Sequence, residues 1–559
     1  MRNPSARRGR VVLGLALGAL LALTGCGGIP TGGPVTAGDL VGDDVELDIG
    51  FAPQGPRAGA PQEEILQDFV NAATNPQGDY AVARQFLAEN LTAEWDPDAT
   101  TYIRTGVGAP QRTSETSFDY LITTAAYVDR DGRYFEGDPS SATLPFSFVK
   151  EGDEWRISSA PPGIVLSADR FPLVFGEYAL YYFDPTYQFL VPEIRWFPKR
   201  SSTSIRAVSA LLAGQANWLS NGVLVSAFPD GTALGDGLVS IASGVATVDL
   251  TEEARDSTEV ERDRMRQQLS SSLATVSSVI LTVGGIQLPT PDAGSNAAVV
   301  NPTVEAAPLI VRDNELGFVT NDDLTPVPQI SGKVGGLGPL AVTLGRGKLA
   351  AAVLAPTGVY SVRANAPEPL LVDGRPGLSA PSIDNSGYIW SVPESNASAI
   401  RVFELNGTEH EVTTSLPPDA RVISLSVSRD GTRLLLYLST GSGPELLVAG
   451  IIRQQGLPTA IGETFALRAG SATPIDAAWV DERTVATLSR SGESTTITSF
   501  EIGGPSETLG SLDAATQITG GRSGRDGLRV LTADGEVFRT RGSSWQLTDA
   551  TAQVLATQQ

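Results

Sequence analysis

Length, composition and charge limit what this chain can be. It has 559 residues, of which 41% are hydrophobic and 18% charged, with 59 glycines, 37 prolines and a formal charge of −23. This length predicts three or four domains, and the composition predicts a folded, turn-rich chain and excludes a disordered one. So large a negative charge disfavours nucleic acid as a partner, and it predicts that the body of the protein stands off an anionic membrane surface.

The first 25 residues have the pattern of an export signal. Four arginines, at positions 2, 7, 8 and 10, precede an apolar run over residues 11–23. A run of this length is too short to cross a bilayer as a helix, which takes about 20 residues, so it predicts a signal peptide over residues 1–25. Its removal takes four positive charges and no acid from the chain, and changes the formal charge from −23 to −27.

The end of the apolar run resembles the lipobox of bacterial lipoproteins, in the residues Leu23, Thr24, Gly25 and Cys26. The resemblance implies that the Cys26 thiol receives S-diacylglycerol, that its amino group is N-acylated after cleavage, and that lipid anchors the protein to the extracytoplasmic face of the cell membrane. Two acyl chains hold a protein stably where one does not. Cys26 is the only cysteine, which excludes an internal disulfide in the mature chain, and the segment over residues 26–59 predicts a flexible tether.

Residues 60–165 predict an α+β domain. After Pro61, Ile65 and Phe69 mark one face of a helix, and a second helical run covers residues 80–87. Strand patterns follow over residues 116–128 and 143–149. Helices followed by an antiparallel sheet give an α+β order, and the segment loosely resembles NTF2-like domains.

Residues 172–285 carry a more specific pattern, which resembles the GerMN domain of spore-germination proteins. In chain order it comprises strands over residues 179–183 and 190–195, a helix with Ala207, Ala210, Leu211 and Leu212, a Phe-Pro-Asp-Gly-Thr turn over 228–232, a strand over 244–250 and a helix over 259–276 with Met265, Leu269 and Leu273 on one face. The resemblance implies a second α+β domain. Turn chemistry and core packing account for each of these motifs, so none of them predicts a reactive site.

Residues 286–308 predict a linker, and residues 309–559 predict an all-β propeller. Turns between short strands recur at intervals of 40, 44, 52 and 52 residues, at Gly347, Gly387, Gly431, Arg483 and Gly535. Repeats of this length are typical of propeller blades and predict about six, with five to seven open. Ser428 to Gly431 resembles TolB-type blades, and Ser382 with Asp384 resembles a sialidase Asp-box with one residue too many, but both predict simple hairpin turns.

The sequence predicts no catalytic residue, no metal ligand and no cofactor. A zinc site needs converging His and Cys ligands, and the chain has one histidine and a cysteine assigned to lipid. His410 is predicted at the exposed tip of a blade hairpin. Ser147 and Lys150 fit a Ser-x-x-Lys motif, but their surroundings predict a strand that points them to opposite faces. Asp129 and Asp131 predict a hairpin turn in preference to a calcium loop.

Two further functions stay open at this stage. Any two of the 63 acidic residues could meet across the propeller channel and hydrolyse envelope glycans as a carboxylate-dependent glycoside hydrolase, although no pattern singles out a pair. The chain could also be a non-catalytic structural or sorting lipoprotein.

The order of lipobox, NTF2-like segment, GerMN domain and C-terminal propeller resembles the LpqB lipoproteins of actinobacteria over essentially the whole chain. The resemblance implies an accessory lipoprotein, not an enzyme. It further implies contact with the extracytoplasmic domain of a sensor histidine kinase of a two-component system, whose modulation affects envelope and cell-wall homeostasis and division.

Overall fold

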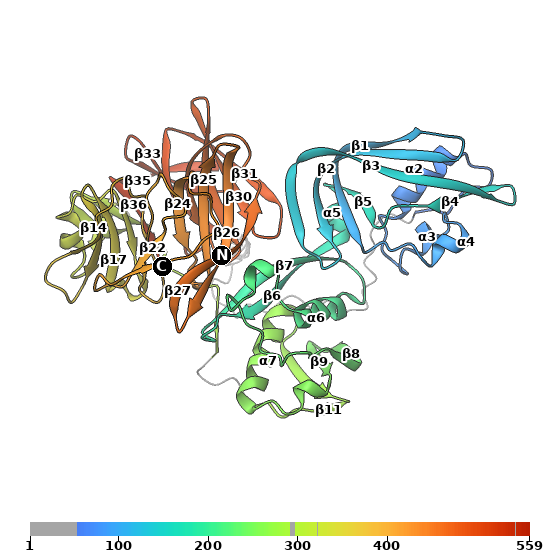
Figure 1. Ribbon diagram of the computed structural model, residues 1–559, viewed down its shortest axis with the longest axis horizontal. Coiled ribbons are helices and arrows are strands. Elements are labelled where there is room, and N and C mark those ends of the chain that lie inside the picture. Colours follow the sequence, from blue (N-terminus) through green and yellow to red (C-terminus); the bar gives the residue numbers. More distant parts are fainter. Residues whose placement is uncertain (1–52, 291–296, 321, 543) are drawn as a thin grey trace, which may run out of the picture. The chain divides into compact units, whose positions relative to one another are not determined.

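The computed structural model describes residues 53–290, 297–320, 322–542 and 544–559 (Figure 1). The predicted signal peptide, the lipobox and most of the predicted tether lie outside these residues, as does part of the predicted linker. In this described part of the chain, no helix is both long enough and apolar enough to cross a membrane.

The N-terminal region is an α+β domain, as predicted, in which helices precede a five-stranded sheet of order β4-β3-β2-β1-β5. Its elements are α2 (Gln62–Ala72), α3 (Ala81–Arg84), α4 (Glu89–Thr92), β1 (Thr100–Arg112), β2 (Ser117–Asp129), β3 (Tyr134–Glu151), β4 (Glu154–Ser159) and β5 (Ile164–Ser167). The apolar face of α2 lies on the sheet, where the Phe69 ring packs edge-on against Trp95 at 5.2 Å and Phe146 at 6.0 Å. Strand β5 pairs with β1 in parallel, and the other pairs are antiparallel.

The second predicted helix of this domain is much shorter than its apolar pattern suggests. Residues 80–87 form only the four-residue helix α3. The Phe86 carbonyl accepts a hydrogen bond from the Ile157 N–H at 2.9 Å, and the Ala88 N–H donates to the Ile157 carbonyl at 2.8 Å. The chain therefore leaves the helix to pair with β4, and a tertiary contact overrides the helical pattern.

The middle region has the predicted GerMN-like order of strands and helices. Its elements are α5 (Phe171–Val174), β6 (Phe175–Phe183), β7 (Phe189–Pro198), α6 (Thr203–Ala213), the 3₁₀ turn η1 (Asn217–Leu219), β8 (Leu234–Ala242), β9 (Val245–Leu250), the 3₁₀ turn η2 (Glu252–Ala254), α7 (Glu259–Ser272), β10 (Ser278–Val283), β11 (Ile286–Gln287) and β12 (Val299–Val300). The strands form two sheets, of order β12-β7-β6 and β11-β10-β9-β8.

Helix α7 is confirmed, but it is shorter at its C-terminal end than predicted. It begins with a capping box, in which the Thr258 hydroxyl accepts from the Glu261 N–H and the Glu261 carboxylate accepts from the Thr258 N–H. It ends at Ser272, four residues before the predicted boundary. The Ser272 hydroxyl donates to the Gln268 carbonyl and accepts from the Tyr181 N–H of β6, and Leu273 has already left helical geometry at φ −103° and ψ 68°. Docking on β6 therefore ends the helix.

The C-terminal region is a β-propeller, and the described residues form six four-stranded blades (Figure 1). Its elements are β13 (Leu309–Arg312), β14 (Glu315–Thr320), β15 (Asp323–Pro326), α8 (Ser331–Gly335), β16 (Ala341–Leu344), η3 (Arg346–Lys348), β17 (Ala350–Ala355), β18 (Gly358–Arg363), β19 (Leu370–Asp373), β20 (Ser382–Ile383), β21 (Ile389–Ser391), β22 (Arg401–Phe403), β23 (Glu409–Glu411), β24 (Arg421–Val427), β25 (Arg433–Thr440), β26 (Gly443–Gln454), β27 (Leu457–Leu467), β28 (Thr473–Trp479), β29 (Thr484–Ser491), β30 (Ser494–Glu501), β31 (Ser506–Asp513), β32 (Ala515–Gly521), β33 (Gly524–Thr532), β34 (Glu536–Arg541), β35 (Ser544–Thr551) and β36 (Val554–Gln558).

The ring is closed by strands from its two ends. The last strand, β36, pairs with β13 and so completes a blade with β13, β14 and β15. On its other side β36 pairs in parallel with β16, the first strand of the next blade. The five remaining blades are each continuous in sequence, from β16–β19 to β32–β35.

One predicted turn belongs to a different hairpin from the rest. Gly347, Gly387, Gly431 and Arg483 lie between the first and second strands of their blades, whereas Gly535 lies between the second and third strands of the last continuous blade. The equivalent turn of that blade, between β32 and β33, is formed around Gly521 and Gly524. The second 52-residue step therefore reflects an Asp-Gly turn in the next hairpin, which the sequence pattern alone does not distinguish.

Candidate functional site

The predicted lipid-attachment site lies outside the described residues. Leu23, Thr24, Gly25 and Cys26 all precede residue 53, the first residue that the structure describes. Lipid attachment at Cys26 therefore stays a prediction from the sequence.

Ser147 and Lys150 lie on strand β3, as predicted. Ser147 is half-buried and pairs with Ser117, whereas Lys150 is exposed and its ammonium nitrogen lies 5.3 Å from the centre of the Trp155 ring. Residues three apart on a strand point to opposite faces. The lysine is thus not set against the serine hydroxyl as a Ser-x-x-Lys site requires.

His410 does not lie at a hairpin tip, so that prediction is wrong. It is the middle residue of β23, where it pairs with Val402, and its Nε2 lies 3.0 Å from Glu404 Oε1. The Glu404 N–H donates to the Thr408 carbonyl at 2.9 Å. This bond closes the turn early, so that the chain is back in a strand by the time it reaches the histidine.

Two of the acidic motifs are turns, as predicted. The Asp129 carboxylate accepts hydrogen bonds from the N–H groups of Asp131 and Arg133, at 2.9 and 2.8 Å, in the hairpin between β2 and β3. Asp384 accepts from the N–H groups of Ser386 and Tyr388 between β20 and β21. Both carboxylates are therefore used to fix backbone turns.

The innermost strands of the six blades surround a central channel of about 230 Å³. Among the described residues that line it, Asp476 of β28 is the single carboxylate. It accepts hydrogen bonds from the Ser424 hydroxyl at 2.7 Å and from the Ile518 N–H at 2.9 Å, and so links β28 to β24 and β32. The two facing carboxylates that a glycoside hydrolase uses are not assembled by these lining residues.

Asp476 predicts a pH-dependent contribution to stability. Burial raises the pKa of its carboxyl to about 6, and the hydrogen bonds from Ile518, Ser424 and Ala477 only partly oppose this effect. Because the folded-state pKa lies above that of the unfolded chain, the stabilisation is complete below about pH 4 and is lost as the pH rises through about 6. We expect the melting temperature of wild type, relative to that of Asp476→Asn, to fall between about pH 4 and about pH 6.5 and to change little above that range.

The matched control for this prediction is Asp373→Asn. Burial raises the pKa of Asp373, but hydrogen bonds from Arg375 and Ser391 outweigh it, so the pKa lies below its usual value. Its stabilisation is present at high pH and is lost only in acid, which is the opposite slope. If the difference in melting temperature between wild type and Asp476→Asn did not change with pH, this result would contradict the raised pKa of the Asp476 carboxyl.

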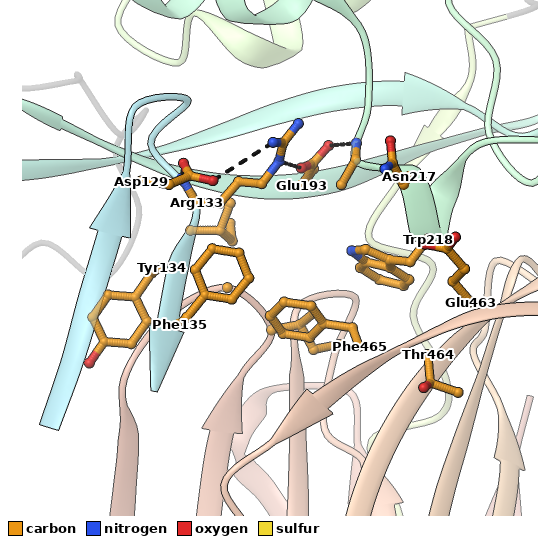
Figure 2. A pocket seen from close by; sticks show the side chains of 14 residues that line it. Asp129, Arg133, Tyr134, Phe135, Glu193, Asn217, Trp218, Glu463, Thr464 and Phe465 are labelled. Carbon is orange, nitrogen blue, oxygen red and sulfur yellow. Dashed lines mark hydrogen bonds and ion pairs between the residues drawn. The ribbon is translucent and has the colours of Figure 1, made fainter. Parts of the chain in front are cut away.

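A second cavity, of about 270 Å³, lies where the three folded regions meet, and we call it the junction pocket (Figure 2). It is lined by Asp129, Arg133, Tyr134 and Phe135 of the first region, by Glu193, Ile194, Ala216, Asn217 and Trp218 of the second, and by Glu463, Thr464, Phe465, Ile502 and Gly503 of the propeller.

Hydrogen bonds and ion pairs join the three regions around the junction pocket. The Trp196 indole N–H donates to the Gly503 carbonyl at 2.8 Å. The Glu136 carboxylate accepts from the Ser506 N–H and hydroxyl, both at 3.0 Å. Arg483 Nη1 lies 2.5 Å from Glu177 Oε1. These contacts hold the walls of the pocket in register.

The polar wall of the junction pocket is built on a buried ion pair. The Glu193 carboxylate accepts from Arg195 Nε at 2.9 Å and from the Ala216 N–H at 3.0 Å, and Arg195 is only 1% exposed. Arg133 lies beside this pair, with its Nε 3.8 Å from Glu193 Oε1, too far for a hydrogen bond. Glu193 and Arg195 compensate each other's charge, and the buried Arg133 Nε–H donates no hydrogen bond.

The opposite wall is aromatic. The Phe465 ring of β27 lies 5.5 Å from the Trp218 ring, nearly parallel to it, and 6.1 Å from the Phe135 ring. Figure 2 shows the indole nitrogen of Trp218 directed into the space between these rings and Glu193. The arrangement can bind a compact molecule that offers both an apolar face and hydrogen-bonding groups.

Sequence reasoning did not find the junction pocket. Phe135 follows a hairpin turn, Trp218 lies in η1 and Phe465 lies on the outer strand of a blade, so they share no local motif. Each is an ordinary core or surface aromatic in its own segment. Trp218 is half-buried and packs against the cores of both the middle region and the propeller, so its own segment gives no signal that it lines a pocket.

Comparison with known proteins places each region in a family. The family model for the N-terminal domain of lipoprotein LpqB matches residues 55–172, the model described as sporulation and spore germination (Germane) matches residues 179–289, and the model for the LpqB β-propeller domain matches residues 312–554. The first GerMN domain of the Bacillus subtilis sporulation protein GerM is 23% identical, covering 22% of this chain and 96% of that one, with a TM-score of 0.18.

Curated relatives bear the name lipoprotein LpqB. That of Cutibacterium acnes is 28% identical over 285 residues, which are 50% of this chain and only about half, 48%, of that protein. That of Rhodococcus opacus is 27% identical over 78% of each chain, and that of Streptomyces avermitilis is 25% identical over 97% of each. With LpqB models on the first and last regions, a GerMN-type model between them and relatives of this name along its length, the chain belongs to the LpqB lipoprotein family.

Proposed function

We propose that this protein is anchored through lipid on Cys26 to the extracytoplasmic face of the cell membrane, where it binds a sensor histidine kinase of a two-component system and modulates it. Contact is with the extracytoplasmic domain of the kinase, and the consequences concern envelope and cell-wall homeostasis and division. The observation that carries the proposal is the order of parts along the chain: a complete lipobox, then the LpqB N-terminal, GerMN and LpqB propeller regions.

The physical basis of the proposal is binding at raised effective concentration. A protein tethered in the same membrane as its partner meets it far more often than a soluble one does, so modest affinity is sufficient. The three regions are joined by hydrogen bonds such as that from Trp196 to Gly503, which favours a fixed binding surface over independent modules. Modulation then requires that the lipoprotein bind one signalling state of the kinase more tightly than the other.

Two observations favour binding over glycoside hydrolysis. Glycoside hydrolysis uses two carboxylates, and the described residues that line the channel include one, Asp476. In the junction pocket, Asp129 holds a backbone turn and Glu193 is paired with Arg195, which leaves Glu463 as a single free carboxylate where the reaction needs two. A non-catalytic role is therefore part of the proposal.

Crosslinking in native membranes tests the proposal. Wild type and Cys26→Ala are expressed at equal level, crosslinked in cells and purified, and the captured proteins are identified by mass spectrometry. We expect the wild-type chain to capture a sensor histidine kinase, and the yield to fall sharply for the unlipidated variant. Capture of no kinase would favour a purely structural or sorting role, and equal yields from both chains would contradict the role of the tether.

A further inference from the structure

The junction pocket contains hydrogen-bonding groups that have no partner among the described residues. The Arg133 Nε is buried without an acceptor. The indole N–H of the half-buried Trp218 and the carboxylate of the exposed Glu463 also line the pocket, and neither has a hydrogen-bonding partner among the described residues. A buried donor without an acceptor, such as the Arg133 Nε, is costly unless a molecule or water completes it, and the two less buried groups are free to bind the same molecule.

These groups comprise both donors and acceptors, and they surround aromatic rings. Arg133 and Trp218 offer N–H donors, and Glu463 offers an acceptor. Phe135 and Phe465, with ring centres 6.1 Å apart, provide the apolar surface. A fitting ligand must therefore donate and accept hydrogen bonds while presenting an apolar face.

The charges of the pocket argue against an ionic ligand. A small anion would lie among the carboxylates of Asp129, Glu193 and Glu463. A small cation would lie beside the guanidinium of Arg133, whose Nε is 3.8 Å from Glu193. Either ion would bring like charges together in a partly enclosed space, which is unfavourable. A neutral ligand avoids both costs.

From this combination we propose that the junction pocket binds a neutral pyranose sugar. The hydroxyl groups of a sugar both donate and accept hydrogen bonds, and the C–H faces of a pyranose ring pack on aromatic side chains. The volume of about 270 Å³ suits a single ring and its substituents better than an extended peptide, which needs an open groove. The sugar contacts all three regions at once, and this binding does not depend on the proposed kinase partner.

Binding of simple glycosides to the full chain in detergent tests this inference. The probes are the methyl glycosides of glucose and N-acetylglucosamine, followed by saturation-transfer NMR and calorimetric titration, with trialanine as the peptide probe. We expect glycoside binding in the millimolar range. Trp218→Phe, which keeps an aromatic ring and removes the N–H, should raise the dissociation constant about fivefold, as should Glu463→Gln.

The matched control is Trp155→Phe. Trp155 lies on β4 outside the junction pocket, and its indole N–H likewise has no hydrogen-bond partner among the described residues, so this variant removes the same group without touching the pocket. Its affinity for the glycosides should be unchanged, and all three variants should melt within a degree or two of wild type. If Trp218→Phe alone unfolds, Glu463→Gln decides the test.

Three results would overturn the inference. The first is no saturation transfer from either glycoside at about 20 mM. The second is glycoside binding that is equal in wild type, Trp218→Phe and Glu463→Gln, since binding would then lie elsewhere. The third is binding of trialanine, but not of the glycosides, that is weakened by Trp218→Phe, which would assign the pocket to a peptide. None of these results bears on capture of the kinase.

Discussion

Replacing Arg433 by leucine is expected to lower the free energy of unfolding by about 3–5 kcal/mol. Arg433 is 1% exposed at the start of β25, its Nη2 lies 2.8 Å from Asp430 Oδ2, and its guanidinium lies 5.1 Å from the centre of the Trp479 ring in the next blade. The substitution leaves the Asp430 carboxylate buried without its counter-charge. Thermal and urea unfolding of the full chain in detergent measure the loss.

The control for this prediction is an exposed ion pair on the same propeller. Arg421 lies 2.9 Å from Glu394, and their side chains are 64% and 44% exposed, so Arg421→Leu should cost no more than about 1 kcal/mol. The double variant Arg433→Leu/Asp430→Asn should recover part of the loss, because it removes the unpaired buried charge. Equal effects of Arg433→Leu and Arg421→Leu would show that burial of the pair has no energetic weight.

Replacing Cys26 by alanine is expected to release the protein from the membrane. The variant keeps the apolar run but has no thiol for lipid, and the body of the chain, with its large negative charge, has no other predicted attachment to anionic lipid. We expect the mature wild type in the detergent-soluble membrane fraction. The variant should appear in the soluble extracytoplasmic fraction or as an unprocessed precursor, and mass spectrometry of the N-terminal peptide should show lipid only on the wild type.

A conservative change beside the cysteine provides the control for this release. Thr24→Ser keeps a small residue within the lipobox and should leave lipid attachment and fractionation unchanged. If Cys26→Ala stayed in the membrane fraction after a high-salt wash, another part of the chain would have to bind lipid. This result would contradict the prediction that lipid on Cys26 anchors the protein.

Much of the fold could be predicted because local patterns and local structure agree. Helix α7 carries its capping box and the buried face of Met265 and Leu269 in its own sequence, and tertiary docking changes only its end. The blades recur because each must bury both faces of a four-stranded sheet against its neighbours, and this need repeats the strand and turn pattern along the chain. The turn around Gly535 deviates because an Asp-Gly turn suits any hairpin of a blade.

The junction pocket and the channel carboxylate could not be predicted, since they depend on contacts between distant segments. Asp476 lies in a strand whose sequence gives no sign that Ser424 and Ile518 will bond to it. Trp218 and Phe465 belong to different regions, and only their docking brings the rings to 5.5 Å. The predicted length of helix α3 was wrong for the same reason, because pairing of Phe86 with Ile157 overrode the local helical pattern.

The most direct test of the proposed function measures kinase output in reconstituted vesicles. The captured sensor histidine kinase is placed in vesicles with the lipidated chain, with Cys26→Ala at the same bulk concentration, or alone, and its autophosphorylation rate is followed. We expect the lipidated chain to change the rate, and the unlipidated chain to do so only at concentrations about 10²- to 10⁴-fold higher. An unchanged rate, with both proteins shown to lie in the same vesicles, would contradict it.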